Sequence, residues 1–133
     1  VAPAFQGSAA SSSGGVARGV KRGEVWTVSA GTDYAGKPRT CVIIQADAFD
    51  AIASITICLF TTPTAQTGLF RPRIEPSPRN GLTQPSPVMV DKTLTVPRRK
   101  LGIRIGSLDR NDLTWVDRAL IVFLGLASGE TQR

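Results

Sequence analysis

Residues 39–45 read RTCVIIQ and residues 54–61 read SITICLFT, and these two stretches decide the fold. Both are short and rich in β-branched residues, which is typical of buried β-strands. In the second stretch, Ile55 and every second residue after it point to one face, and the residues between them point to the other. Both faces of this stretch therefore carry apolar side chains. No long helix fits between the two stretches, and we therefore expect them to pair antiparallel, with a short turn or a helical turn over residues 46–51.

Working outward, residues 24–29 (EVWTVS) predict a strand before this pair, followed by a loop over residues 30–38. The downstream region is rich in proline. We expect short strands there at residues 70–74, 86–90, 91–96 and 103–108. Asp109 is a suitable N-cap for a C-terminal helix that ends near Gly125 or Gly129. The helix is indicated by apolar residues at helical spacing, namely Leu113, Val116, Leu120, Phe123 and Leu124.

This order of elements predicts a mainly β protein with some α, a small antiparallel barrel or twisted sheet closed by a C-terminal helix. The length of 133 residues suits one domain. We expect a flexible tail rich in Ala, Ser and Gly at residues 1–20, the folded domain at residues 21–127, and a short tail at residues 128–133.

Positive charge is concentrated in one region of the chain. The formal net charge is +6, and the region 71–104 holds eight cations and two acids, which accounts for all of it. One-sided charge on a small β domain favours a polyanionic partner, nucleic acid first and acidic protein segments second. The alternative is a solvated face that has no partner.

Residue types that are missing or rare exclude several kinds of chemistry. The chain has no histidine, which removes Ser-His-Asp and Cys-His nucleophile systems and imidazole zinc sites. Cys41 and Cys58 lie in apolar runs and are expected to be buried thiols, with a disulfide between neighbouring strands left open. No apolar run approaches the roughly 20 residues of a membrane helix, and we expect a cytoplasmic protein.

Two polar groups next to the predicted strands form a candidate phosphate site. Arg39 stands at the entrance of one strand, after Lys37, and Thr61 and Thr62 stand at the exit of the next. In an antiparallel pair these ends meet at one edge, where a guanidinium and hydroxyls can hold a phosphate. By spacing alone, an ordinary surface arginine at position 39 remains an alternative.

At this point the chain resembles the MazF/PemK-type toxins of bacterial toxin–antitoxin pairs. The resemblance spans residues 21–127 and rests on the order and spacing of short strings followed by a terminal helix. The matching strings are residues 22–26 (RGEVW), 36–39 (GKPR), 42–45 (VIIQ), 59–62 (LFTT), 87–92 (PVMVDK), 95–96 (TV), 100–101 (KL) and 105–108 (IGSL).

The resemblance implies an SH3-like barrel of the CcdB/MazF type with a C-terminal helix, usually a homodimer. It also implies a metal-independent endoribonuclease, without cofactor, that cuts single-stranded RNA at short sequences. Arg39 and Thr61 match the family's catalytic pair, and the acidic residue of the first loop falls at Asp33. The family commonly has proline directly after the arginine, whereas here Thr40 follows it and Pro38 precedes it.

RNA contacts and partners follow from the same resemblance. An antitoxin with an acidic tail would hold the toxin inactive, and the pair together would bind DNA. Trp26 is a candidate for stacking on a base, with a place in the barrel core as its alternative. The expected RNA-binding residues are Trp26, Lys37, Thr62, Arg71, Arg73, Arg79, Asp91, Lys92, Arg98 and Arg99.

Two other functions compete with the ribonuclease. CcdB-type toxins resemble this fold and poison DNA gyrase through the end of the terminal helix, which carries a Trp-Gly-Ile ending. This chain has Leu124-Gly125-Leu126 there and no terminal tryptophan. A non-catalytic SH3-like RNA-binding module is the second alternative, and it would bind RNA in a salt-dependent manner without cutting it.

Overall fold

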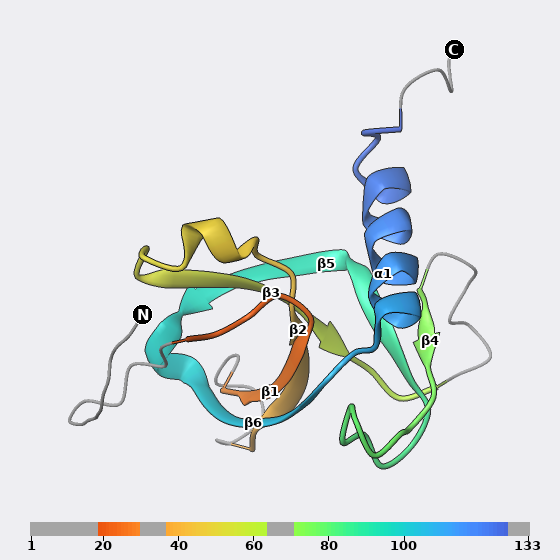
Figure 1. Ribbon diagram of the computed structural model, residues 1–133, viewed down its shortest axis with the longest axis horizontal. Coiled ribbons are helices and arrows are strands. Elements are labelled where there is room, and N and C mark those ends of the chain that lie inside the picture. The colour runs from red at the N-terminus through yellow and green to blue at the C-terminus, as the bar shows by residue number, and fades with distance from the viewer. Residues whose placement is uncertain (1–18, 30–36, 64–70, 128–133) are drawn as a thin grey trace.

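The computed structural model describes residues 19–29, 37–63 and 71–127. Its strands form a single curled antiparallel sheet in the order β4-β5-β3-β2-β1-β6, with one C-terminal helix (Figure 1). This half-barrel with a terminal helix confirms the predicted fold class. The elements are β1 (Glu24–Val28), β2 (Arg39–Ile43), η2 (Asp47–Phe49), β3 (Ser54–Phe60), β4 (Arg73–Ile74), β5 (Ser86–Pro97), η3 (Arg98–Lys100), β6 (Leu101–Ser107) and α1 (Arg110–Phe123).

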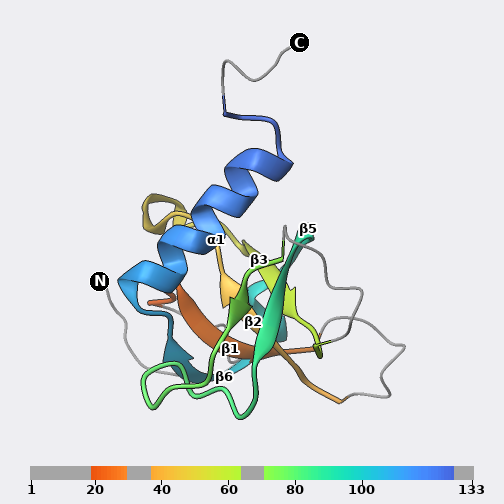
Figure 2. The ribbon, with the colours of Figure 1, turned by 90° about the vertical axis from the view of Figure 1, so that its right-hand side faces the viewer.

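The alternation of side chains along β3 divides the core into two clusters. Ile55, Ile57 and Leu59 belong to a first cluster on one face of the sheet. Cys58 and Phe60 belong to a second cluster on the other face, which also includes residues of α1. Figure 2 shows α1 lying across the strands on that side. Burial on both faces explains why β2 and β3 are apolar almost throughout.

The packed domain starts slightly earlier than the sequence predicts. Val20, placed at the end of the expected tail, is 2% exposed and lies in the first cluster. Residues 1–18 of that tail, the short C-terminal tail at 128–133 and residues 30–36 of the loop lie outside the described residues. No helix in the described ranges is long and apolar enough to cross a membrane.

The two strands predicted at residues 86–90 and 91–96 are wrong, because the structure has one strand, β5, over both. β5 pairs with β3 with a register shift between Cys58 and Phe60. No turn residue separates Val90 from Asp91, so the chain bends at the irregularity instead of reversing. The final strand also begins two residues earlier than predicted, at Leu101, directly after η3.

The terminal helix has the expected limits. The Asp109 side chain accepts a hydrogen bond from the Asp112 backbone N–H at 2.8 Å, which satisfies a free donor of the first turn. Gly125 follows the helix with a φ of 72°, a conformation that favours glycine. Val116 and Leu120 bury the inner face, whereas Val122, Leu124 and Leu126 are exposed.

The two cysteines are free and buried, so the disulfide alternative is wrong. Cys41 lies opposite Leu59 and Cys58 lies opposite Val42 in the β2–β3 register. The two thiols consequently belong to different core clusters on opposite faces of the sheet. Burial raises the pKa of each thiol to about 12, so both stay protonated and act as small apolar side chains.

Candidate active site

Arg39 and Thr61 come together at the open end of the β2–β3 pair. Cys41 lies opposite Leu59 in this register, and continuing it by one further pair on the same face places Arg39 opposite Thr61. Arg39 Nη2 donates to the Phe60 carbonyl oxygen at 3.2 Å. The Thr61 backbone N–H donates to the Pro87 carbonyl at 2.9 Å, which ties the end of β3 to β5. The meeting of these strand ends, inferred from sequence, is confirmed.

A pocket of about 270 Å³ opens beside these two residues. One side is formed by Arg39, Thr40, Thr61 and Thr62, which offer a guanidinium and three hydroxyls. Such donors suit the oxygens of a phosphate, because a guanidinium presents a planar fork of N–H groups and stays protonated. Thr40, which stands where the family commonly has proline, thus contributes to the pocket wall.

The opposite wall of the pocket comes from residues 81–86, which the sequence analysis did not identify. Thr83, Gln84 and Ser86 line it, together with Leu82 and Gly81. The Ser86 hydroxyl donates to the Gln84 carbonyl at 2.8 Å, which shapes the turn before β5. The only signal in the sequence was a run of polar side chains between prolines, and it does not distinguish this segment from an ordinary loop.

The buried side chain of Asn80 supports this wall through hydrogen bonds to the neighbouring backbone. It is 2% exposed, and its Oδ1 accepts hydrogen bonds from the Ser77 and Leu82 backbone N–H groups at 3.0 and 2.9 Å. Its Nδ2 donates to the Glu75 carbonyl at 2.9 Å. On the other side the turn lies against β6, where a Cβ at Gly106 would overlap the backbone of Arg79 and Asn80. The wall is therefore held both by the side-chain amide of Asn80 and by a close backbone contact with β6.

Trp26 lies away from this pocket. It is partly buried and packs against the first core cluster, and its Nε1 donates to Glu24 Oε1 at 3.0 Å. This position agrees with the alternative of a barrel-core aromatic, because an indole with an apolar body and a satisfied N–H suits the core edge. Stacking of Trp26 on a base has no support from this geometry.

Arg71 and Asp91 form a bidentate pair that holds the start of β4 against β5. Arg71 Nε and Nη2 donate to the two carboxylate oxygens of Asp91 at 2.8 and 2.7 Å. The side chains are only 19% and 16% exposed. Hydrogen bonding from Arg71 lowers the pKa of Asp91 below its ordinary value, and the Asp91 carboxylate in turn raises the pKa of Arg71. Neither residue lines the Arg39–Thr61 pocket.

Replacing Asp91 by asparagine is expected to destabilise the fold by about 1–3 kcal/mol at neutral pH, because the half-buried Arg71 loses its charged partner. The folded-state pKa lies below the ordinary 3.8, so the pair stabilises the protein above pH 3.8 and stops doing so as the pH falls through that lower pKa. Urea unfolding at pH 7 and pH 3 checks this. A stability gap between the two proteins that stays constant with pH would contradict it.

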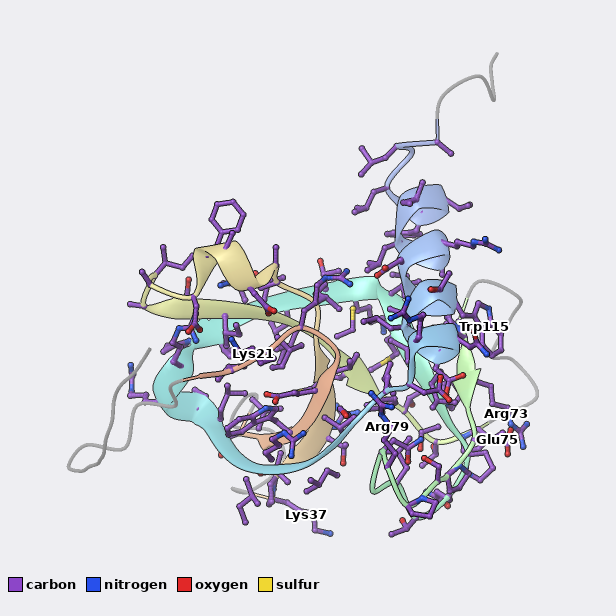
Figure 3. All side chains as sticks on the ribbon, viewed as in Figure 1. Lys21, Lys37, Arg73, Glu75, Arg79 and Trp115 are labelled. Atoms are coloured by element: carbon purple, nitrogen blue, oxygen red, sulfur yellow. The ribbon has the colours of Figure 1, made fainter. Side chains whose placement is uncertain are left out.

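The other predicted RNA-binding cations are dispersed. Arg98 is 4% exposed, and its guanidinium donates to the Ile52 carbonyl at 2.6 Å and to Asp50 at 3.0 Å, so it fastens η3 to the β2–β3 connection. Arg73 is exposed and pairs with Glu75 at 3.4 Å (Figure 3). Lys37, Lys92 and Arg99 are exposed away from the pocket wall. Arg79 lines a second pocket beside the first turn of α1.

The proposed role of Asp33 and the expected independence from metal ions both remain predictions. Asp33, the proposed acidic residue of the first loop, lies outside the described residues. Within the three described ranges, no group of three or more Cys, Asp or Glu side chains is arranged to hold a metal ion. The donors that the structure does bring together are Arg39 and the neighbouring threonines.

Comparison with known families decides the relationship. Residues 21–124 match the model of the PemK-like, MazF-like toxins of type II toxin–antitoxin systems. The chain belongs to this toxin family. It is also 49% identical over 108 residues to the probable endoribonuclease MazF of Mycolicibacterium smegmatis, a match that covers 81% of this chain and 99% of that protein. This membership favours neither the gyrase-binding nor the non-catalytic alternative.

Solved MazF structures share the fold. A mycobacterial endoribonuclease in complex with its cognate antitoxin superimposes with a TM-score of 0.67 at 21% identity, covering 80% of this chain and 96% of that one. The MazE–MazF structure from Deinococcus radiodurans gives a TM-score of 0.64 at 14% identity, covering 80% and 96%. At these identities the likeness establishes the MazF architecture, a curled sheet with a terminal helix.

Proposed function

We propose that this MazF-family toxin is a metal-independent, sequence-specific endoribonuclease that cleaves single-stranded RNA in the cytoplasm and thereby inhibits translation and growth. One observation carries the proposal. Arg39 and Thr61, which match the catalytic pair of the family, share one open pocket at the end of the β2–β3 pair. Family membership and the 49% identity to a probable endoribonuclease support it.

The proposed reaction uses the RNA itself as the nucleophile. The 2′-hydroxyl attacks the adjacent phosphorus, the bond to the 5′-oxygen breaks, and the products are a 2′,3′-cyclic phosphate and a 5′-hydroxyl. Arg39 stabilises the negative charge that develops on the non-bridging oxygens, and Thr61 donates a hydrogen bond to the same phosphate. Asp33 is the carboxylate proposed to take the proton from the 2′-hydroxyl, and the leaving 5′-oxygen takes up a proton from water.

The proposed partners are a second copy of the chain and an acidic antitoxin. The end of α1 leaves Val122, Leu124 and Leu126 exposed, and an apolar surface of this kind is typical of an interface. Contact with a second copy would bury it. The net charge of +6 suits an antitoxin with an acidic tail, which would fold onto the toxin, and the complex would bind DNA.

The direct test is cleavage of a long single-stranded RNA by the purified protein in EDTA, with the ends mapped by primer extension. We expect discrete cuts with 5′-hydroxyl ends at a short recurring sequence. A DNA of the same sequence should stay intact, because it lacks the 2′-hydroxyl that attacks. An RNA with a single 2′-deoxy substitution at a mapped site should resist cutting at that site alone.

The Arg39→Ala protein, purified in the same way, reports any contaminating ribonuclease. Intact RNA at high concentrations of the wild-type protein would contradict the proposal. In that case, a salt-dependent shift of the RNA in a gel would favour the non-catalytic binding module.

A further inference from the structure

A second pocket, of about 390 Å³, lies where β1 begins, β6 ends and α1 starts. Its lining is rich in positive charge and includes Lys21, Arg22, Arg79, Arg104 and Arg110. Figure 3 shows Arg79 close to the point where β6 leads into α1. Four of these five cations are absent from the RNA-binding set that the sequence predicts, and they come from segments far apart along the chain.

Two carboxylates pair with two of the five cations of this cationic pocket, so its net charge stays positive. Arg104 Nε lies 2.8 Å from Glu24 Oε2, and Arg22 Nη1 lies 2.7 Å from Asp117 Oδ1. Arg22 Nε also donates to the Ile44 carbonyl at 2.9 Å, so two contacts hold its guanidinium. A held guanidinium loses less side-chain entropy when an anion binds.

The other three cations of the pocket are available to a ligand. Within residues 19–29, 37–63 and 71–127, Lys21, Arg79 and Arg110 make no ion pair with a carboxylate. All three are exposed. Five cations against two acids leave an excess of positive charge, which is the local condition for binding phosphate oxygens.

The cationic pocket and the Arg39–Thr61 pocket are neighbours along one turn and one strand. Gly81 and Ile105 line the first pocket, whereas Arg79 and Ser107 line the cationic pocket. The same short turn and the same strand thus border both. Ile105 and Ser107 are two residues apart on β6, which corresponds to about 6.6 Å along a strand. A few nucleotides of extended RNA are enough to cover that step.

We propose that the cationic pocket binds a backbone phosphate of the same RNA strand whose scissile phosphate occupies the Arg39–Thr61 pocket. The inference rests on the proposed ribonuclease function and adds a second anchoring point to it. The site takes phosphate without reading a base, so it strengthens the binding of RNA of any sequence that extends past the turn at 79–81. Its continuity with the first pocket favours RNA over an acidic protein segment.

The test compares a double variant, Arg79→Gln with Arg110→Gln, with a charge-matched control. The control is Arg118→Gln with Lys100→Gln, which removes two exposed cations outside both pockets. The probes are a dinucleotide, whose single phosphate is the scissile one, and an RNA of about twelve nucleotides around a site that the wild-type protein cuts. Each carries a 2′-deoxy group at the cleaved position, so that binding is measured without cleavage.

For the long probe, we expect the pocket variant to raise Kd by about five- to tenfold and to lower the slope of log Kd against log salt by about 0.7, the change for one lost phosphate contact. The short probe and the control variant should bind as in the wild type. In cleavage of the long RNA, KM should rise while kcat at saturation stays unchanged, since the scissile phosphate keeps its own donors.

Equal binding of both probes by the pocket variant and the wild type would overturn the inference. If the variant instead loses affinity only for poly-glutamate, the pocket serves an acidic protein segment and the RNA assignment is wrong. Failure of the ribonuclease function is distinguishable, because the wild-type protein would then cut no RNA before any variant is compared.

Discussion

Replacing Arg39 by alanine is expected to lower the rate of RNA cleavage by at least about 10²-fold, and by up to about 10³-fold, while the fold is retained. The guanidinium is the positive charge that β2 places in the Arg39–Thr61 pocket, opposite the end of β3. Without it, the charge that develops on the phosphate would have only hydroxyl donors and water. The loss should appear in kcat, because the interaction is strongest in the transition state.

Single-turnover cleavage of a mapped RNA site measures this effect. Arg39→Lys is the informative companion, because it keeps the charge but lacks the planar fork that contacts two oxygens. We expect its rate to fall between those of the wild type and the alanine variant. Circular dichroism should show the same fold for all three proteins. A rate for the alanine variant within tenfold of the wild type would mean that Arg39 is not a catalytic residue.

Replacing Asn80 by alanine is expected to destabilise the protein by about 2–4 kcal/mol, which is the largest effect that we expect from any polar side chain. The change leaves the Ser77 and Leu82 backbone N–H groups and the Glu75 carbonyl without the partner that the buried amide provides. These three hydrogen bonds are part-buried, and a polar group that loses its partner in such a place carries a desolvation cost. The turn between the two pockets should loosen as a result.

Urea unfolding of the Asn80→Ala protein checks the prediction, with Asn111→Ala as the matched control. Asn111 lies exposed on α1, so its replacement should change the free energy of unfolding by less than about 0.5 kcal/mol. Because Asn80 supports the wall formed by residues 81–86, cleavage should also weaken in the Asn80 variant at temperatures where it remains folded. A destabilisation below about 1 kcal/mol would indicate that water replaces the amide.

Much of the fold could be predicted because its signals are local. The β-branched runs of β2 and β3, their alternation and the Asp109 cap each depend on neighbours a few residues away. The juxtaposition of Arg39 with Thr61 could be predicted too, since antiparallel pairing brings the entrance of one strand to the exit of the next.

Neither the full length of β5 nor the interaction partners of several charged residues could be predicted. Continuous pairing with β3 through a register shift joins two predicted strands into one. Arg98 and Arg99 are adjacent arginines, yet the structure buries Arg98 against the Ile52 carbonyl and the Asp50 carboxylate and leaves Arg99 exposed. Arg71 and Asp91 were both expected to contact RNA, and the structure places them within hydrogen-bond distance of each other. Such pairing depends on residues distant in the chain.

By itself, the sequence determined the class of this protein: a small basic β domain with a terminal helix, without histidine chemistry, and with an arginine and a threonine at adjoining strand ends. Long-range packing determines which further side chains line the two pockets. The 81–86 wall and the cationic pocket are built from turns, strands and a helix start that meet only when the sheet curls. The physical reason is that periodicity and capping are local, whereas the burial or exposure of a charge depends on the partners that long-range packing brings to it.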